Sequence, residues 1–270
     1  MVSFLKYARI GIICIWRVIF DYFTWILPYS RHPEKYPLEK RYRKARGLIL
    51  YLLRHYRFEP RLINPEILAT DKPVVYVANH LSALDPLMLI ALSPRPVSFI
   101  AKKEAKKIPA AGRLITAING LFLDRDDPFQ AVKVFRQAVK NMEETGISYG
   151  IFPEGTRNKD PYSARTLDFH PGALKLAYKA KCPIRLYAQF GSFHAMDNVA
   201  GRSHLWTIRG VKSIEYDEYQ DVKSVLLATH LRSQIEEYLP SLAQEDKKYY
   251  DTKQQKHRPS KWQEKLPKTE

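Results

Sequence analysis

Residues 73–92 read PVVYVANHLSALDPLMLIAL and join two different structural patterns. The run 73–77 is rich in β-branched side chains, which predicts a buried strand. The run 87–92 is apolar and follows a proline, a residue that suits the first turn of a helix. A buried strand followed closely by a helix favours an α/β fold, in which strands alternate with covering helices.

His80 lies where this strand is predicted to end, and Asp85 follows five residues later. Neutral imidazole accepts a proton from a hydroxyl near pH 7, and it does so best when an acceptor holds its second nitrogen. Because Pro86 disfavours helical backbone at the preceding residue, the chain turns here and lets Asp85 lie beside His80. The pair would then be a general base and its orienting carboxylate. On this stretch alone, an equally good interpretation makes Asp85 a helix cap and His80 a core histidine.

The chain from residue 73 onward alternates between predicted strands and helices. Strands are predicted at 74–78, 97–101, 120–123, 149–152, 184–190 and 206–214, and helices at 86–92, 129–144, 172–180 and 222–238. This order predicts an α/β domain over residues 63–245, with a mostly parallel mixed sheet flanked by helices. Residues 246–270 are polar and low in aliphatic side chains, which predicts a loose C-terminal tail.

Residues 1–62 are predicted to form a separate helical element. The run 10–27 reads IGIICIWRVIFDYFTWIL, and as a helix it would be about 27 Å long, close to the thickness of a bilayer core. Between residues 31 and 61, basic side chains outnumber acidic ones ten to three. These features predict a two-helix membrane-binding element whose basic side meets anionic lipid. The run 10–27 can either span the membrane or lie in its interface, and the alternative is a helix packed on its own domain beside a solvated basic face.

Charge and cysteine content bound the partners and the compartment. The chain has 270 residues, with 44 Lys and Arg against 28 Asp and Glu, for a formal net charge of +16. Such an excess predicts an anionic partner, either nucleic acid, an anionic membrane, or a phosphorylated or acidic-carrier substrate. Cys14 and Cys182 form no CxxC pair, which favours a reducing compartment. The sequence contains no HExxH motif, and no metal site is predicted.

Two further predicted turns carry side chains that suit an anionic ligand. Residues 151–157 read IFPEGTR, in which Gly155 allows a ligand to approach the backbone and Arg157 offers a bidentate fork for phosphate. Residues 120–125 read GLFLDR and end another strand in an arginine, and two lysines follow a third strand at 102–103. The two arginines and a lysine could converge on one phosphate, although each taken singly reads as a turn residue or a surface charge.

Together these blocks resemble the glycerolipid acyltransferase family typified by the 1-acyl-glycerol-3-phosphate acyltransferases. Residues 79–85 match the family's NHxxxxD motif, and residues 152–157 match FPEGTR at every position. Residues 120–125 match its GxxFxxR-type block with the arginine one position early, and residues 182–187 match a fourth, proline-containing block in part. The resemblance covers residues 74–190, most of the predicted α/β domain.

The resemblance implies that His80 acts as general base on the 2-hydroxyl of lysophosphatidic acid, with Asp85 orienting the imidazole. The hydroxyl would attack an acyl thioester directly, from acyl-ACP or acyl-CoA, and give phosphatidic acid without a cofactor. The substrate-binding residues that the resemblance implies are Asn79, Lys103, Arg125, Glu154, Gly155, Thr156 and Arg157. Among them, Arg125 and Arg157 would hold the phosphate of the acceptor, with Lys103 as a weaker candidate.

We therefore expect an enzyme of phospholipid biosynthesis on the cytoplasmic side of the cell membrane, with no nucleic-acid partner. The nearest alternative is the same chemistry on another lysophospholipid, although three basic residues able to reach one phosphate favour a monoester. A basic nucleic-acid-binding protein is an alternative of another class, but the sequence contains no recognisable module of that kind. A catalytically silent membrane protein is the last alternative, and the presence of both His80 and Asp85 argues against it.

Overall fold

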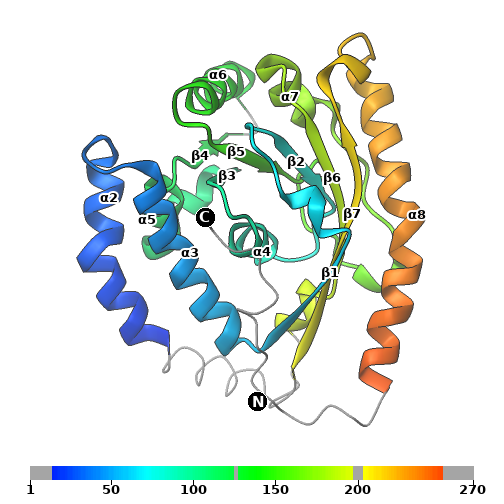
Figure 1. Cartoon of the computed structure of the whole chain (residues 1–270), viewed down its shortest axis with the longest axis horizontal. Coiled ribbons are helices and arrows are strands. Elements are labelled where there is room, and N and C mark those ends of the chain that lie inside the picture. The colour runs from blue at the N-terminus through cyan, green and yellow to red at the C-terminus, as the bar shows by residue number, and fades with distance from the viewer. Residues whose placement is uncertain (1–13, 125–126, 197–202, 252–270) are drawn as a thin grey trace.

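A seven-stranded mixed sheet forms the centre of the computed structural model, which describes residues 14–124, 127–196 and 203–251 (Figure 1). Its strands are β1 (Phe58–Ile63), β2 (Val75–Ala78), β3 (Val97–Lys102), β4 (Leu121–Leu123), β5 (Ser148–Ile151), β6 (Ile184–Phe190) and β7 (His204–Ile214). The strand order is β1-β7-β6-β2-β5-β3-β4, and every neighbouring pair is parallel except β6 and β7. The predicted α/β class with a mostly parallel mixed sheet is confirmed.

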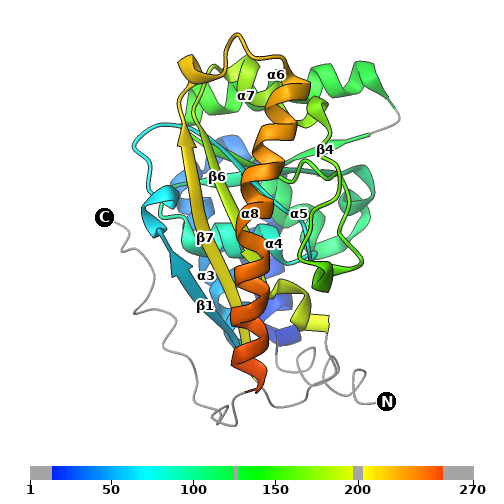
Figure 2. The same cartoon turned by 90° about the vertical axis from the view of Figure 1, so that its right-hand side faces the viewer.

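Helices cover both faces of this sheet. The helices are α2 (Leu27–Arg31), α3 (Leu38–His55), α4 (Asp85–Leu92), α5 (Pro109–Ala117), α6 (Pro128–Thr145), α7 (Lys175–Ala180) and α8 (Ser224–Asp251). Along β2, Tyr76 and Ala78 pack with α3 and α4, whereas Val75 and Val77 pack with α6, α7 and α8. This alternation follows from the two-residue period of a strand and makes β2 the most enclosed part of the sheet. Figure 2 shows α8 running along β6 and β7, on the face of the sheet that it covers.

The N-terminal helices pack against the α/β domain instead of standing apart from it. Residues 14–21 are helical and continue through a π-helical turn, η1 (Tyr22–Ile26), into α2. Trp25 and Ile26 are buried in the core shared with α3 and α4. Outward, Trp16, Phe20 and Phe23 are 74%, 64% and 67% exposed, and we call these three side chains the aromatic face. Among the described residues, no helix combines the length and apolar character needed to cross a bilayer.

Strand β1 was not predicted from the sequence. Its residues 58–63 pair with β7 in parallel, so the predicted boundary at residue 62 between helical element and α/β domain falls inside a strand. The segment reads FEPRLI, in which a proline and two charged residues break the strand pattern. An edge strand tolerates such residues because only one of its sides needs to donate to the sheet.

The start of the predicted C-terminal tail is also corrected. Helix α8 continues to Asp251, well past the predicted end at residue 238. Its buried side chains recur at helical spacing through Leu239 and Leu242, and Pro240 lies on the exposed side. Asp246 is buried and accepts a hydrogen bond from Nε2 of His194 at 2.8 Å. The rest of the predicted tail, residues 252–270, lies outside the described residues.

Candidate active site

The four predicted site blocks follow four adjacent parallel strands. His80 follows β2, residues 152–157 follow β5, Lys103 follows β3, and Arg125 follows β4. Because parallel strands present their carboxyl ends at one edge, the blocks form a row along that edge, where ligands bind in open α/β sheets. At about 4.8 Å per strand, the β5 block lies next to His80, and the end of strand β4 lies about 14 Å from the end of β2.

His80 and Asp85 are in direct contact. The Oδ2 atom of Asp85 lies 2.7 Å from Nδ1 of His80 and also accepts the backbone N–H groups of residues 81 and 82, at 2.7 and 2.9 Å. Because a carboxylate accepts hydrogen bonds, this contact favours the tautomer of the neutral imidazole that has its proton on Nδ1 and its lone pair on Nε2. The carboxylate is fully buried and makes no cap to α4, which rules out the helix-cap interpretation.

The ring of His80 is held from a second direction by stacking. Phe152 lies parallel to it, with ring centroids 4.5 Å apart and an interplanar angle of 18°. Phe99 stacks behind Phe152, and a Cβ atom at Gly150 would overlap the Phe99 ring, so this position on β5 needs a glycine. The side chain of His80 remains 18% exposed. The imidazole is therefore fixed in orientation while part of it reaches the surface.

Glu154 is buried, and its carboxylate binds two backbone N–H groups. One of its carboxylate oxygens accepts the N–H of His80 at 2.5 Å, and the other accepts the N–H of Leu167 at 2.8 Å. Burial raises the pKa of Glu154 to about 7, although these two hydrogen bonds act in the opposite direction. Glu154 therefore joins the turn that carries His80 to the loop after β5.

Asn79 is likewise buried and paired. Its side chain donates to the carbonyl of Gln189 and accepts from the N–H of Gln189, both at 2.9 Å, and its own carbonyl accepts from the Gln189 side chain at 2.7 Å. These bonds tie the end of β2 to β6. In this structure Asn79 positions the strand end immediately before His80 and has almost no exposed surface.

The turn at residues 155–157 presents an exposed arginine next to His80's strand. Gly155 has a φ of +67°, a left-handed conformation that glycine adopts without strain, and its N–H donates to the carbonyl of Phe152 at 3.0 Å. Thr156 and Arg157 are exposed. Arg157 has no hydrogen-bond or ion-pair partner among the described residues, so its guanidinium is available to an anionic ligand.

Lys103, another predicted phosphate ligand, lies further along the edge. Nζ of Lys103 forms an ion pair with Asp124 at 2.7 Å, which links the ends of β3 and β4. Arg125 lies outside the described residues. Its predicted convergence with Arg157 on one phosphate therefore stays a prediction. Among the described residues, no group of three or more His, Cys, Asp or Glu side chains is placed to hold a metal ion.

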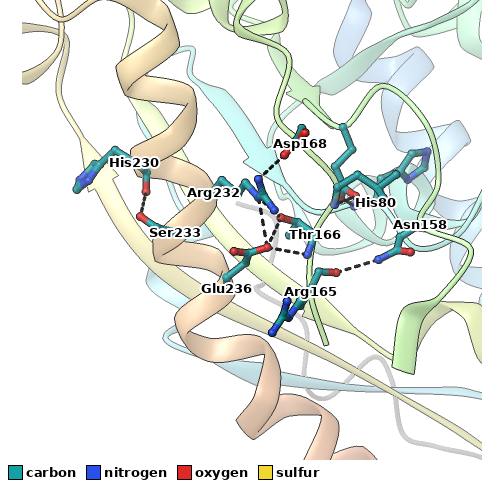
Figure 3. Close-up of polar contacts among 11 residues, drawn as sticks. His80, Asn158, Arg165, Thr166, Asp168, His230, Arg232, Ser233 and Glu236 are labelled. Carbon is teal, nitrogen blue, oxygen red and sulfur yellow. Dashed lines mark hydrogen bonds and ion pairs between the residues drawn. The ribbon is translucent and has the colours of Figure 1, made fainter. Parts of the chain in front are cut away.

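Two contributors to the site escaped the sequence analysis. The N–H of Asn158 donates to the carbonyl of His80 at 2.9 Å, and the Phe152 ring stacks on the imidazole. Figure 3 shows Asn158 and His80 close together beside the loop after β5. Phe152 belongs to the FPEGTR match but its stacking role was not predicted, and the only sequence signal for Asn158 was its position directly after that motif.

Comparisons with known proteins find acyltransferases among the similar sequences. The sequence model of the family named Acyltransferase matches residues 59–185. The chain is 34% identical over 175 residues to a probable 1-acyl-sn-glycerol-3-phosphate acyltransferase of Mycoplasma genitalium, covering 63% of each chain. It is 35% identical over 115 residues to the 1-acyl-sn-glycerol-3-phosphate acyltransferase of Limnanthes douglasii, a match that spans 43% of this chain and 40% of that protein.

A solved structure has the same fold. The crystal structure of the 1-acyl-sn-glycerophosphate acyltransferase PlsC from Thermotoga maritima matches with a TM-score of 0.69 and 22% identity. The match covers 89% of this chain and 95% of that one. The predicted N-terminal helices, mixed sheet and flanking helices thus form an arrangement already known from a solved protein.

Proposed function

Since the chain carries a domain of the acyltransferase family, we propose that it transfers an acyl chain from an acyl thioester to the sn-2 hydroxyl of lysophosphatidic acid, giving phosphatidic acid. The observation that carries this proposal is the contact between His80 and Asp85 at the carboxyl edge of the sheet. It leaves Nε2 of a fixed, partly exposed imidazole ready to accept a proton. The names of the relatives support the acceptor, because they are 1-acyl-sn-glycerol-3-phosphate acyltransferases.

In the proposed reaction His80 is the general base. Its Nε2 takes the proton of the acceptor hydroxyl as the oxygen attacks the carbonyl carbon of the thioester. The new C–O bond forms, the C–S bond breaks, and the imidazolium returns the proton to the leaving sulfur. Asp85 keeps the Nδ1 proton in place and offsets the positive charge that the ring carries in between.

Arg157 is the best-placed phosphate ligand for this acceptor. It belongs to the block that adjoins β2, about one strand spacing from His80, and its side chain is exposed. A guanidinium binds a phosphate monoester through two parallel hydrogen bonds. The end of β4, the strand that precedes Arg125, lies three strand spacings from that of β2, so Arg157 is expected to dominate.

We also propose that the N-terminal helices hold the protein on the cytoplasmic side of an anionic membrane. The aromatic face supports this, because exposed Trp and Phe side chains suit the depth of lipid headgroups. The net charge of +16 adds a favourable attraction to anionic lipid and to either acidic donor, acyl-ACP or acyl-CoA.

Acyl transfer by the purified protein tests the proposal. Wild type and His80→Ala are incubated with anionic vesicles, each donor, and either lysophosphatidic acid or lysophosphatidylcholine. We expect phosphatidic acid from wild type and a loss of at least about a hundredfold in the variant. Product from lysophosphatidylcholine alone would overturn the acceptor, and activity unchanged in His80→Ala would overturn the mechanism.

A further inference from the structure

The loop that carries the PEGTR turn lies between the catalytic turn and helix α8. It runs from the end of β5 to the short helix η6 (Pro171–Leu174), and its one regular segment is the short helix η5 (Pro161–Ser163). Figure 3 shows its residues 165–168 between α8 and the turn that holds His80. Loops of this length have little internal support, so external contacts must set the position of this one.

Contacts along residues 165–168 alternate between the two sides. The carbonyl of Arg165 and the N–H of Leu167 bind the PEGTR side, whereas Thr166 and the side chain of Asp168 bind α8. This alternation is that of an extended chain, in which neighbouring residues point in opposite directions. The segment therefore acts as a strap, with one face bound to the PEGTR side and the other bound to α8.

On the α8 side, the bonds converge on one oxygen of Glu236. Its Oε1 accepts the N–H of Thr166 at 3.0 Å, the hydroxyl of Thr166 at 2.9 Å and Nε of Arg232 at 3.3 Å. Partial burial acts against the ionised form, but the bonds from Thr166 and the charge of Arg232 hold the pKa of Glu236 below its usual range. Arg232 also pairs with Asp168, whose side chain is 89% exposed, and a pair so exposed contributes little. Thr166 is buried, so its two bonds to Glu236 are the firm part of the contact.

On the other side, the strap leads to both backbone groups of His80. Leu167 binds Glu154, which accepts the N–H of His80. Asn158 donates its side-chain amide to Arg165 and its own N–H to the carbonyl of His80, each at 2.9 Å. Two chains of hydrogen bonds therefore connect α8 to the catalytic histidine through four consecutive loop residues.

We propose that Glu236, supported by Arg232, is a positioning residue for His80, acting through Thr166, Leu167 and Glu154. The inference rests on the proposed acyl transfer, because it concerns the placement of its general base. A proton transfer requires hydrogen-bond geometry, and a misplacement of about 1 Å can cost about a hundredfold in rate. Release of the strap from α8 removes one of the two supports of Glu154 and lets the backbone of His80 shift.

Variants of Glu236 test the inference by activity. In Glu236→Ala we expect kcat to fall about tenfold or more, with KM for lysophosphatidic acid changed less than about twofold. Glu236→Gln retains one acceptor oxygen for Thr166 and should recover most of kcat. Glu237→Ala is the matched control, because it removes the same charge from the same helix at an exposed neighbouring position.

Hydrogen exchange of the Leu167 amide tests the physical link directly. We expect exchange at least about tenfold faster in Glu236→Ala than in Glu237→Ala, since the Leu167 bond to Glu154 opens more often without the strap. Equal exchange, or an active wild type with equal kcat in the two alanine variants, would overturn the inference. A loss of kcat in Glu236→Ala that Glu236→Gln does not recover would also overturn the inference, if the melting temperatures of the two variants fall by the same amount. A wild type that acylates no lysophospholipid would instead overturn the proposed function, while the exchange result still decides the contact.

Discussion

Asp85→Asn isolates the charge of the buried carboxylate from its shape. Asparagine keeps a carbonyl oxygen that can accept the N–H groups of residues 81 and 82, which Oδ2 accepts at 2.7 and 2.9 Å. It removes the negative charge that faces the imidazole of His80 at 2.7 Å. With about 4 Å between charge centres and an effective dielectric constant of about 20, the lost stabilisation of the imidazolium is roughly 4 kcal/mol. That energy corresponds to about a thousandfold in kcat.

The assay is acyl transfer to lysophosphatidic acid on vesicles, with the melting temperature measured in parallel. We expect kcat to fall about a thousandfold while the melting temperature changes little, because replacing a buried charge by a neutral isostere removes a desolvation cost as well. Asp217→Asn, at an exposed position after β7 and at the opposite edge of the sheet, is the matched control. A kcat within tenfold of wild type in Asp85→Asn would refute the assignment of charge stabilisation to this carboxylate.

Three further results are expected. The pKa of Glu154 is raised from 4.5 to about 7, so the carboxyl group stays protonated to a higher pH in the native state than in the unfolded chain. The free energy of unfolding of the wild type, relative to that of Glu154→Gln, should therefore fall by about 3 kcal/mol as the pH rises from 4.5 to 7. A difference in unfolding free energy, measured with denaturant, that does not change over this pH range would contradict the expectation. Arg157→Ala should raise KM for lysophosphatidic acid about tenfold or more by loss of charge-assisted hydrogen bonds, whereas Lys159→Ala, on the same exposed loop, should not; equal KM values in the two variants would argue against Arg157 as the phosphate ligand. Replacing the three side chains of the aromatic face by serine should weaken vesicle binding about tenfold or more in a flotation assay. An equal loss of binding in Leu226→Ser, at an exposed position near the start of α8, would show that membrane binding does not depend specifically on this face.

Much of the fold was predictable because it is encoded locally. Each of the six predicted strands forms within two residues of its expected ends, and most of them are short, mainly apolar runs. Strand β1 was missed because its residues carry no strand pattern, and its partner β7 begins at His204, far along the chain. The length of α8 was missed because Pro240 interrupts the pattern, although proline on the exposed side of a helix can be accommodated when the buried side chains continue past it.

The contact between His80 and Asp85 was one of two interpretations that the local sequence allowed. His80 and Asp85 are five residues apart, and the proline between turn and helix already implied that the chain bends there. The role of Glu154 was not predictable at this level, because its two partners are backbone groups of His80 and Leu167. A backbone N–H has no identity in a sequence, so a side chain that binds one leaves no pattern to find.

Residue types and short spacings alone determined the α/β class and the kinds of side chain that suit a phosphorylated acceptor, and they left the His80–Asp85 pair as one of two equal interpretations. The tertiary structure decided their order in space, because strand order places the β5 block beside His80 although β3 and β4 come between them in the chain. It also decided which polar residues face a ligand and which are buried in support, as the contrast between exposed Arg157 and buried Asn79 shows. The physical reason is that covalent connectivity controls conformation only over a few residues. Contacts between distant segments, such as Thr166 with Glu236, form only when hydrophobic burial packs the sheet and its helices together.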